Sequence, residues 1–218
     1  MEIRELSTSG AYEFLPHVFE DRRGKFVAPF QGKTFADVLG HPLSLAQVNV
    51  SVSRKGTIRG VHFADTPPGQ AKYVWCPRGA LLDVVVDLRV DSPTFGRWDA
   101  IRLDATDFHA LYIAEGLGHA FVALEDETIM AYLCSTGYNP EREHGITPLD
   151  EDLSLPWPDD IEPILSDKDA QAPTLRQALD ADLLPSYDVC VTHYATAQAQ
   201  WATAQPAEAF SLTEHTKS

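Results

Sequence analysis

The chain has 218 residues, a hydrophobic content of 44% and a formal net charge of −15, which together are typical of a globular protein with an acidic surface. Such a surface repels phosphate backbones, so the composition argues against nucleic acid as a partner. The cysteines, Cys76, Cys134 and Cys190, lack CxxC spacing, which indicates reduced thiols in a cytoplasmic protein. We find no secretory signal pattern and no apolar run of about 18 residues, and therefore expect neither secretion nor membrane insertion.

A succession of short apolar segments occupies residues 45–135. Each segment alternates apolar with polar side chains or is rich in β-branched residues, and Gly, Pro or Asp turns separate them. No helical periodicity persists through this stretch. The pattern predicts an all-β sandwich or barrel with strands at 45–53, 57–63, 70–76, 80–89, 97–103, 110–114, 119–124 and 128–135.

The composition changes after about residue 140. Residues 139–160 are rich in Pro, Asp and Glu and predict ordered loop or short strand. Residues 173–185 predict a short helix, since one proline begins the segment and another ends it. From residue 195 onward Ala, Gln and Thr dominate, and we expect a loosely attached helix or a mobile tail.

Several residues in the predicted strands could carry chemistry. Lys72 shares the strand parity of His62, whereas Arg59 faces away from His62 unless its strand twists or bulges. A lysine inside a barrel is costly unless an anion or a function compensates it, so Lys72 either serves a site or keeps its ammonium in water at an edge. Taken alone, His62, Tyr132 and Asp169 are also compatible with a structural histidine, a core aromatic and a helix cap.

The pattern does not favour a metal or a cofactor. His62 lacks the paired His-x-His arrangement, because positions 60 and 64 are Gly and Ala, and His119 is left as the other candidate ligand. No GxGxxG, GxxxxGK[ST] or GxSxG motif occurs, so nicotinamide, P-loop and serine-hydrolase chemistry find no support. We therefore expect no metal and no cofactor.

Several motifs, taken in chain order, resemble those of one known family. The chain is similar to the dTDP-4-dehydro-6-deoxyhexose (dTDP-4-dehydrorhamnose) 3,5-epimerases, and in particular to members that make deoxysugars for antibiotics. The resemblance covers about residues 19–175. The matching motifs are FEDRRGKF (19–26), KGTIRGVHF (55–63), DVVVDLRVDSPTFG (83–96), GLGHAF (116–121) and LSDKD (165–169).

The resemblance implies a fold and an assembly. We expect a cupin-type jelly roll, or double-stranded β-helix, with short C-terminal helices. Residues 1–185 would form the cupin epimerase domain, and residues 186–218 a C-terminal extension or mobile tail. The family is usually a homodimer whose sheets exchange strands, so a homodimer is expected here.

The resemblance also implies an isomerase reaction and four catalytic residues. The substrate would be a dTDP-4-keto-6-deoxyhexose, inverted at C3, C5 or both by removal of a proton next to the C4 ketone and reprotonation from the opposite face. His62 matches the base, Asp169 its acidic partner, Tyr132 the acid on the other face, and Lys72 the residue near the C4 carbonyl oxygen. These types suit the reaction, because a developing enolate needs a cationic donor and a base with a pKa near neutrality.

Further positions match family residues that bind the substrate. The sugar and diphosphate site would contain Arg23, Arg59, His119 and Lys168, with Tyr138 packed beside the sugar and base. The nucleotide would contact Phe26, Gln47, Asn49 and Glu143. Ala28 departs from the family, which often has Glu at that position. A 3,4-ketoisomerase on the same scaffold and a non-catalytic sugar-nucleotide binder are the alternative functions.

Overall fold

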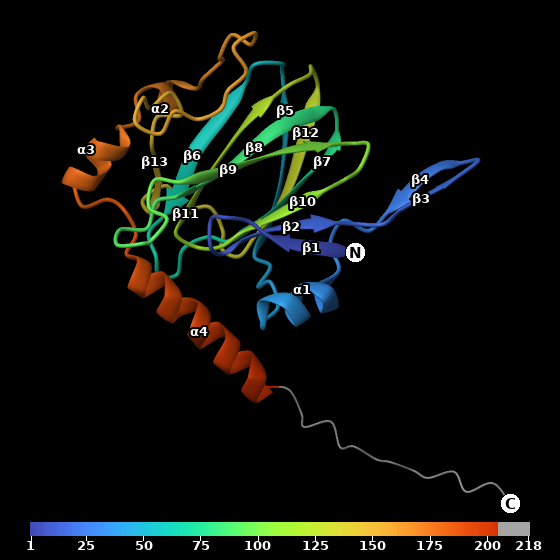
Figure 1. Ribbon diagram of the computed structural model, residues 1–218, viewed down its shortest axis with the longest axis horizontal. Helices are drawn as coiled ribbons and strands as arrows, with labels where there is room; N and C mark the ends of the chain where they lie inside the picture. The colour runs from blue at the N-terminus through green and yellow to red at the C-terminus, as the bar shows by residue number, and fades with distance from the viewer. Residues whose placement is uncertain (205–218) are drawn as a thin grey trace, which may run out of the picture.

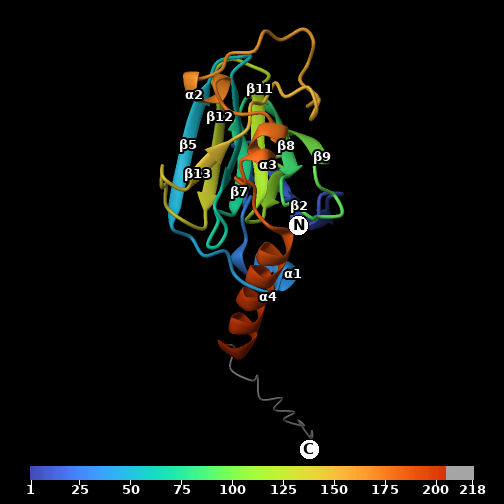
Figure 2. The ribbon, with the colours of Figure 1, turned by 90° about the vertical axis from the view of Figure 1, so that its left-hand side faces the viewer.

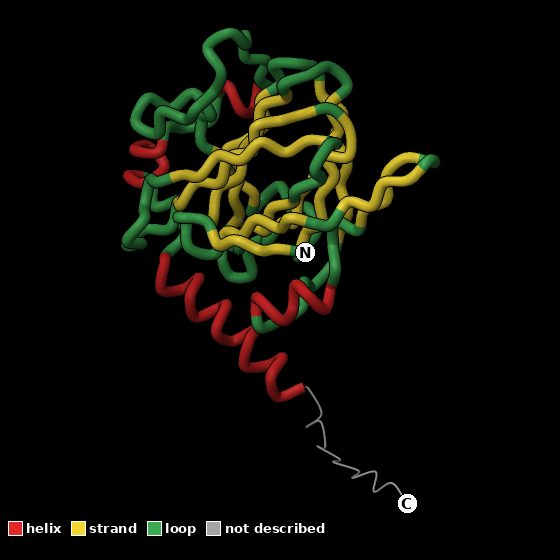
Figure 3. Tube along the Cα trace, turned by 45° about the vertical axis from the view of Figure 1, so that its right-hand side comes forward, coloured by secondary structure: helices red, strands yellow, loops and turns green. Residues whose placement is uncertain are grey.

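The computed structural model describes residues 1–204 as two antiparallel sheets that enclose a common interior (Figures 1–3). The six-stranded sheet contains, in spatial order, β1 (Glu2–Glu5), β2 (Ala11–Leu15), β10 (Ala110–Ile113), β7 (Lys72–Arg78), β12 (Thr128–Cys134) and β5 (Gln47–Ser53). The five-stranded sheet contains β13 (Glu143–Gly145), β6 (Ile58–Ala64), β11 (Leu117–Ala123), β8 (Ala80–Asp87) and β9 (Trp98–Asp104). A separate hairpin is formed by β3 (Val18–Asp21) and β4 (Gly24–Val27).

The predicted all-β architecture is confirmed. Each of the strands predicted between residues 45 and 135 overlaps a strand of one of the two sheets. Strands β1 and β2 and the β3–β4 hairpin were not predicted, since these segments are short and lack sustained alternation. The hairpin projects away from the two sheets (Figures 1 and 3).

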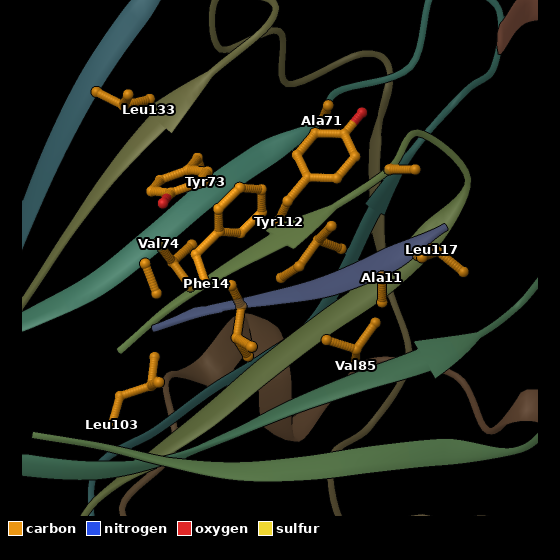
Figure 4. Packing of buried hydrophobic residues seen from close by; sticks show 14 of the residues in the cluster. Ala11, Phe14, Ala71, Tyr73, Val74, Val85, Leu103, Tyr112, Leu117 and Leu133 are labelled. Carbon is orange, nitrogen blue, oxygen red and sulfur yellow. The ribbon is translucent and has the colours of Figure 1, made fainter. Parts of the chain in front are cut away.

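Aromatic side chains dominate one part of the interior (Figure 4). The Tyr73 ring lies 5.1 Å from that of Phe14, and Phe35 contacts Tyr112 at 5.0 Å, with edge-to-face geometry in both pairs. The Tyr73 hydroxyl donates a hydrogen bond to the Pro29 carbonyl at 2.6 Å, which satisfies its polar atom. These contacts hold α1 (Gly32–Leu39) and the segment before it against the inner face of the six-stranded sheet.

In strand β5 the polar side chains point inward and the apolar side chains point outward, which is the reverse of an ordinary core strand. Its inward side chains are polar and partly buried, namely Gln47, Asn49 and Ser51. The outer face carries Val48, Val50 and Val52, of which Val50 is 65% exposed. The polar face therefore lines a cavity inside the fold, while the valines leave an apolar strip on the surface.

A buried ion pair stabilises the end of β8. The guanidinium of Arg89 donates to Asp87 through Nε and Nη2, both at 2.8 Å. The hydroxyls of Ser92 and Thr94 donate to the same carboxylate at 2.6 Å. Burial alone would raise the pKa of Asp87, but these donors outweigh it and lower the pKa, so the carboxylate stays charged.

Within residues 1–204, four helices accompany the sheets: α1 (Gly32–Leu39), α2 (Asp167–Ala170), α3 (Leu175–Asp180) and α4 (Tyr187–Ala204). Helix α3 is shorter than the predicted 173–185, because the chain turns after Asp180 and Asp182 adopts a φ of +54°. Helix α2 lies at the end of the barrel opposite α4 (Figures 1 and 2). No helix within residues 1–204 is long and apolar enough to cross a membrane.

Helix α4 contacts the rest of the fold along its length. Cys190 is fully buried, the Tyr194 hydroxyl donates to the Glu115 carbonyl, and Gln198 Nε2 donates to the Leu39 carbonyl at 2.8 Å. The helix thus begins before residue 195 and is attached to the body. The remainder of the predicted tail, residues 205–218, lies outside the described residues.

Candidate active site

A cavity of about 450 Å³ opens between the two sheets. Strands of both sheets and the segment containing α2 contribute to its lining. The structure brings all predicted site residues to this cavity except Arg23 and Phe26. The residues brought together are Gln47, Asn49, Arg59, His62, Lys72, His119, Tyr132, Tyr138, Glu143, Lys168 and Asp169.

His62 and Asp169 form a hydrogen-bonded pair at the cavity wall, with 2.7 Å between Nε2 and Oδ1. Asp169 is held by the first turn of α2, where its backbone N–H donates to the Ser166 side chain. Burial raises the pKa of Asp169, but the hydrogen bond with His62 outweighs it and the pKa is lowered. With its Nε2–H donating to the carboxylate, His62 carries its lone pair on Nδ1, as a general base requires.

Arg59 and His62 line the same cavity although they differ in strand parity. Between β6 and β11, His62 pairs with His119 and Arg59 pairs with Phe121, so β6 contains one extra residue in this interval. Gly60 lies within the interval at a φ of +118°, and a Cβ there would come within 2.4 Å of the His119 carbonyl oxygen. The bulge reverses the alternation and requires glycine.

Lys72 lies inside the barrel and is exposed only in part, at the cavity. No hydrogen bond from its ammonium to another residue of the described chain is present. Burial lowers the pKa of Lys72, and the nearby groups Cys134, Glu143 and Asp83 partly counteract the shift. The structure therefore places Lys72 at a site, rather than at an edge with its ammonium in bulk water.

Tyr132 faces the cavity from β12, which belongs to the six-stranded sheet, whereas His62 lies on β6 of the other sheet. The ring also packs against the aromatic core. Burial raises the pKa of Tyr132, with Cys134 adding to the shift and Arg59 opposing it. Tyr132 is thus a phenol that can donate a proton, and it is a core aromatic as well.

A second histidine–carboxylate pair lies behind the first. His119 Nε2 is 2.8 Å from Asp83 Oδ2, and both side chains are buried. Burial lowers the pKa of His119 although the charge of Asp83 opposes the shift. Asp83 was not among the predicted site residues, although an aspartate in the middle of the apolar run ALLDVVVD is a signal that could have identified it.

One end of the cavity contains amide side chains. Gln47 donates from Nε2 to Asn49 Oδ1 at 2.7 Å and accepts at Oε1 from the backbone N–H of Tyr138 at 3.0 Å. Tyr138 is 60% exposed, so its ring is accessible to a ligand. These groups offer donors, acceptors and an aromatic face, which suits a nucleobase.

Arg23 and Phe26 lie outside the cavity, on the projecting β3–β4 hairpin (Figure 1). Phe26 is 69% exposed. Arg23 makes an ion pair with Asp21, two residues away in the same hairpin, at 2.6 Å. Neither residue contributes to the cavity of its own chain.

Comparison with known proteins gives consistent matches over most of the chain. The family model for dTDP-4-dehydrorhamnose 3,5-epimerase matches residues 5–177. A dTDP-4-dehydro-6-deoxyglucose 3-epimerase of Streptomyces bikiniensis is 52% identical over 182 residues, which cover 84% of this chain and 93% of the relative. A dTDP-4-dehydrorhamnose 3,5-epimerase of Mycolicibacterium smegmatis is 52% identical over 190 residues, covering 87% and 94% respectively.

A solved structure extends the match to the fold. The crystal structure of a 3′-monoepimerase from Streptomyces bikiniensis in complex with dTDP-quinovose superimposes with a TM-score of 0.88 and 49% identity, covering 89% of this chain and 98% of the other. Its similarity confirms the predicted cupin-like jelly roll, and the named relatives are epimerases. The chain therefore belongs to the dTDP-4-dehydrorhamnose 3,5-epimerase family and is an isomerase.

Proposed function

We propose that this epimerase inverts C3, C5 or both in a dTDP-4-keto-6-deoxyhexose. The observation that carries the proposal is the arrangement of His62 and Tyr132 on opposite sheets of one cavity. A base and an acid that reach a bound sugar from opposite sides are what inversion at carbon requires. The Asp169 carboxylate, 2.7 Å from His62, supports the base.

The proposed reaction proceeds through an enolate. Nδ1 of His62 takes the proton from the carbon next to the ketone, and the electron pair of the broken C–H bond moves to the C4 carbonyl oxygen. The ammonium of Lys72 donates a hydrogen bond to that oxygen, which lowers the energy of the developing charge. The Tyr132 hydroxyl then gives its proton to the opposite face of the carbon, and exchange with water restores both residues.

The few cations of this acidic protein account for binding of the diphosphate. Arg59 lines the cavity, with its Nε donating to the Ser53 hydroxyl at 3.3 Å, and Lys168 lines it as well. Both charges can pair with phosphate oxygens. Tyr138 and the amides of Gln47 and Asn49 would contact the thymine, with Glu143 nearby.

We further propose a homodimer in which the hairpin of one copy completes the cavity of the other. The hairpin extends from the body (Figure 3) and exposes Phe19 and Phe26, which are 58% and 69% accessible. The valine strip on β5, at the edge of the six-stranded sheet, offers a second apolar surface next to the cavity. In this assembly Arg23 and Phe26 would reach the diphosphate and the base from the partner copy.

We also propose that the reaction takes place in the cytoplasm. Cys76, Cys134 and Cys190 are buried and unpaired, which is typical of proteins kept in a reducing compartment.

The decisive experiment is solvent deuterium exchange on dTDP-4-keto-6-deoxyglucose, resolved by carbon position. We expect the wild-type protein to incorporate deuterium at C3, C5 or both, and His62→Asn to reduce exchange by about a hundredfold or more. Exchange that His62→Asn leaves unchanged would contradict the role of His62. A product with a migrated carbonyl would identify a 3,4-ketoisomerase, and binding without exchange would identify a non-catalytic binder.

A further inference from the structure

Asp83 is a carboxylate enclosed in the middle of β8, with buried apolar side chains next to it along the strand. One of its oxygens, Oδ2, binds His119 Nε2 at 2.8 Å. The other, Oδ1, is enclosed by protein and has no hydrogen-bond partner within residues 1–204. A buried carboxylate oxygen without a donor costs stability, and such groups deserve a functional explanation.

The two side chains on which Asp83 acts, Lys72 and His119, both line the active-site cavity. Lys72 carries an ammonium that donates no hydrogen bond within the described chain, and the Asp83 charge acts on it. His119, the direct partner of Asp83, also lines the cavity and pairs with His62 across β6 and β11. The interior therefore contains both the Asp83 oxygen that lacks a donor and the Lys72 ammonium that lacks an acceptor within residues 1–204.

We propose that Asp83 is a positioning residue of the epimerisation site, which orients the His119 ring and supplies the negative charge that compensates the Lys72 ammonium. Its hydrogen bond to Nε2 leaves Nδ1 of His119 as the ring atom available to the sugar. Its charge favours the protonated lysine, the form that can donate to the C4 oxygen. The inference rests on the proposed function, because it takes Lys72 as the group that faces the ketone.

Other titratable groups face the same residues and must be held constant in a test. Cys134 on β12 and Glu143 on β13 act on Lys72, and His62 acts on His119. Asp83 differs from them because it acts on both Lys72 and His119 and is fully buried. Removing its charge alone should therefore change the protonation of the lysine.

The test is the pH dependence of kcat for Asp83→Asn. Without the negative charge, Lys72 loses its proton at lower pH, so the alkaline limb of the profile should move measurably to lower pH. At a pH on the alkaline limb of the wild-type profile, kcat should fall severalfold while KM changes little. An alkaline limb at the wild-type position, with kcat unchanged, would overturn the inference.

Asp87→Asn is the matched control, since Asp87 is also fully buried on β8 but pairs with Arg89 away from the cavity. It should lower stability without moving the limb. If Asp83→Asn does not fold, Asp83→Glu provides the test. The longer side chain retains the charge but displaces it from His119, so the limb should stay and kcat should fall; an unchanged kcat would contradict the positioning role.

Lys72→Met separates the inference from the function on which it rests. If this variant keeps wild-type exchange, the role proposed for Lys72 is wrong. If it is inactive while Asp83→Asn keeps the wild-type profile, the role of Lys72 stands and the inference about Asp83 alone is wrong.

Discussion

His62 Nε2 and Asp169 Oδ1 lie 2.7 Å apart although 107 residues separate them in the chain. The contact depends on the segment that precedes α2. Ile164 forms a parallel bridge with Thr57, and its carbonyl accepts from the Ile58 N–H at 3.0 Å, which ties this segment to the start of β6. The helix that carries Asp169 is thereby fixed against the strand that carries His62.

We expect Asp169→Asn to reduce kcat about a hundredfold, because the amide neither fixes the imidazole tautomer nor stabilises the imidazolium that forms. The measurement is steady-state epimerisation of the ketosugar with the concentration of folded protein matched. Asp167→Asn is the control, since Asp167 is an exposed residue of the same helix. Equal activity of the two variants would show that Asp169 does not act through His62.

The same carboxylate should make stability depend on pH. Its pKa is lowered, since the His62 hydrogen bond outweighs the effect of burial. A group with a lower pKa in the folded than in the unfolded state contributes stability above the unfolded value, and this contribution disappears as the pH falls through the folded value. The difference in unfolding free energy between wild type and Asp169→Asn should therefore be largest above about pH 4 and shrink below it. Urea titrations at several pH values measure it, and a constant difference would contradict the linkage.

Tyr132→Phe should separate proton removal from inversion. The variant keeps the ring that packs against the core but loses the hydroxyl that faces the cavity. We expect formation of the inverted product to fall about a hundredfold, while deuterium exchange with retention through His62 falls at least tenfold less. Product stereochemistry and exchange are read from the same NMR samples. Equal loss of both would exclude Tyr132 as the acid of the second step.

The strands between residues 45 and 135 could be predicted because their own side chains carry the signal. Alternation in β5 and the β-branched run in β8 are local properties of the sequence. The shared parity of Lys72 and His62 is likewise read from the alternation within their own strands, β7 and β6. The polar positions of β5 were expected to contact the nucleotide, and the structure places Gln47 and Asn49 at the cavity.

The remaining features depend on contacts between distant segments. The bulge at Gly60, which brings Arg59 beside His62, results from pairing with β11 and is not visible in β6 alone. The approach of Asp169 requires the bridge at Ile164. The resemblance to a family supplied Asp169 as a candidate, whereas periodicity left it a possible helix cap.

Breaking the buried ion pair at the end of β8 should destabilise the fold. Arg89→Met removes two donors from Asp87 and leaves a charge in the interior, which typically costs about 3–5 kcal/mol. Urea denaturation measures the loss. Arg176→Met is the matched surface control, because Arg176 is 75% exposed and 3.8 Å from Asp152, and its loss should stay below about 1 kcal/mol. Similar losses of unfolding free energy in the two variants would mean that the buried pair stabilises the fold no more than the surface pair does.

The position of Arg23 on the hairpin leads to a complementation experiment. Arg23→Ala should raise KM for the ketosugar by about tenfold, since it removes one cation that would pair with the diphosphate. His62→Asn chains would have no base but keep the hairpin. In a mixed dimer, the intact base of the Arg23→Ala chain receives Arg23 from its partner, so one cavity is complete.

Mixing the two variants after brief unfolding and refolding should therefore restore activity at low substrate concentration to about a quarter of the wild-type value, because half of the dimers are mixed and each contains one complete site. Refolding each variant alone is the control. If Arg23 acts within its own chain, mixing restores no activity above the sum of the activities of the two variants refolded alone.

Val50→Glu tests the assembly itself. A charge in the exposed valine strip on β5 should convert the dimer to monomers, as measured by light scattering, and should raise KM in parallel.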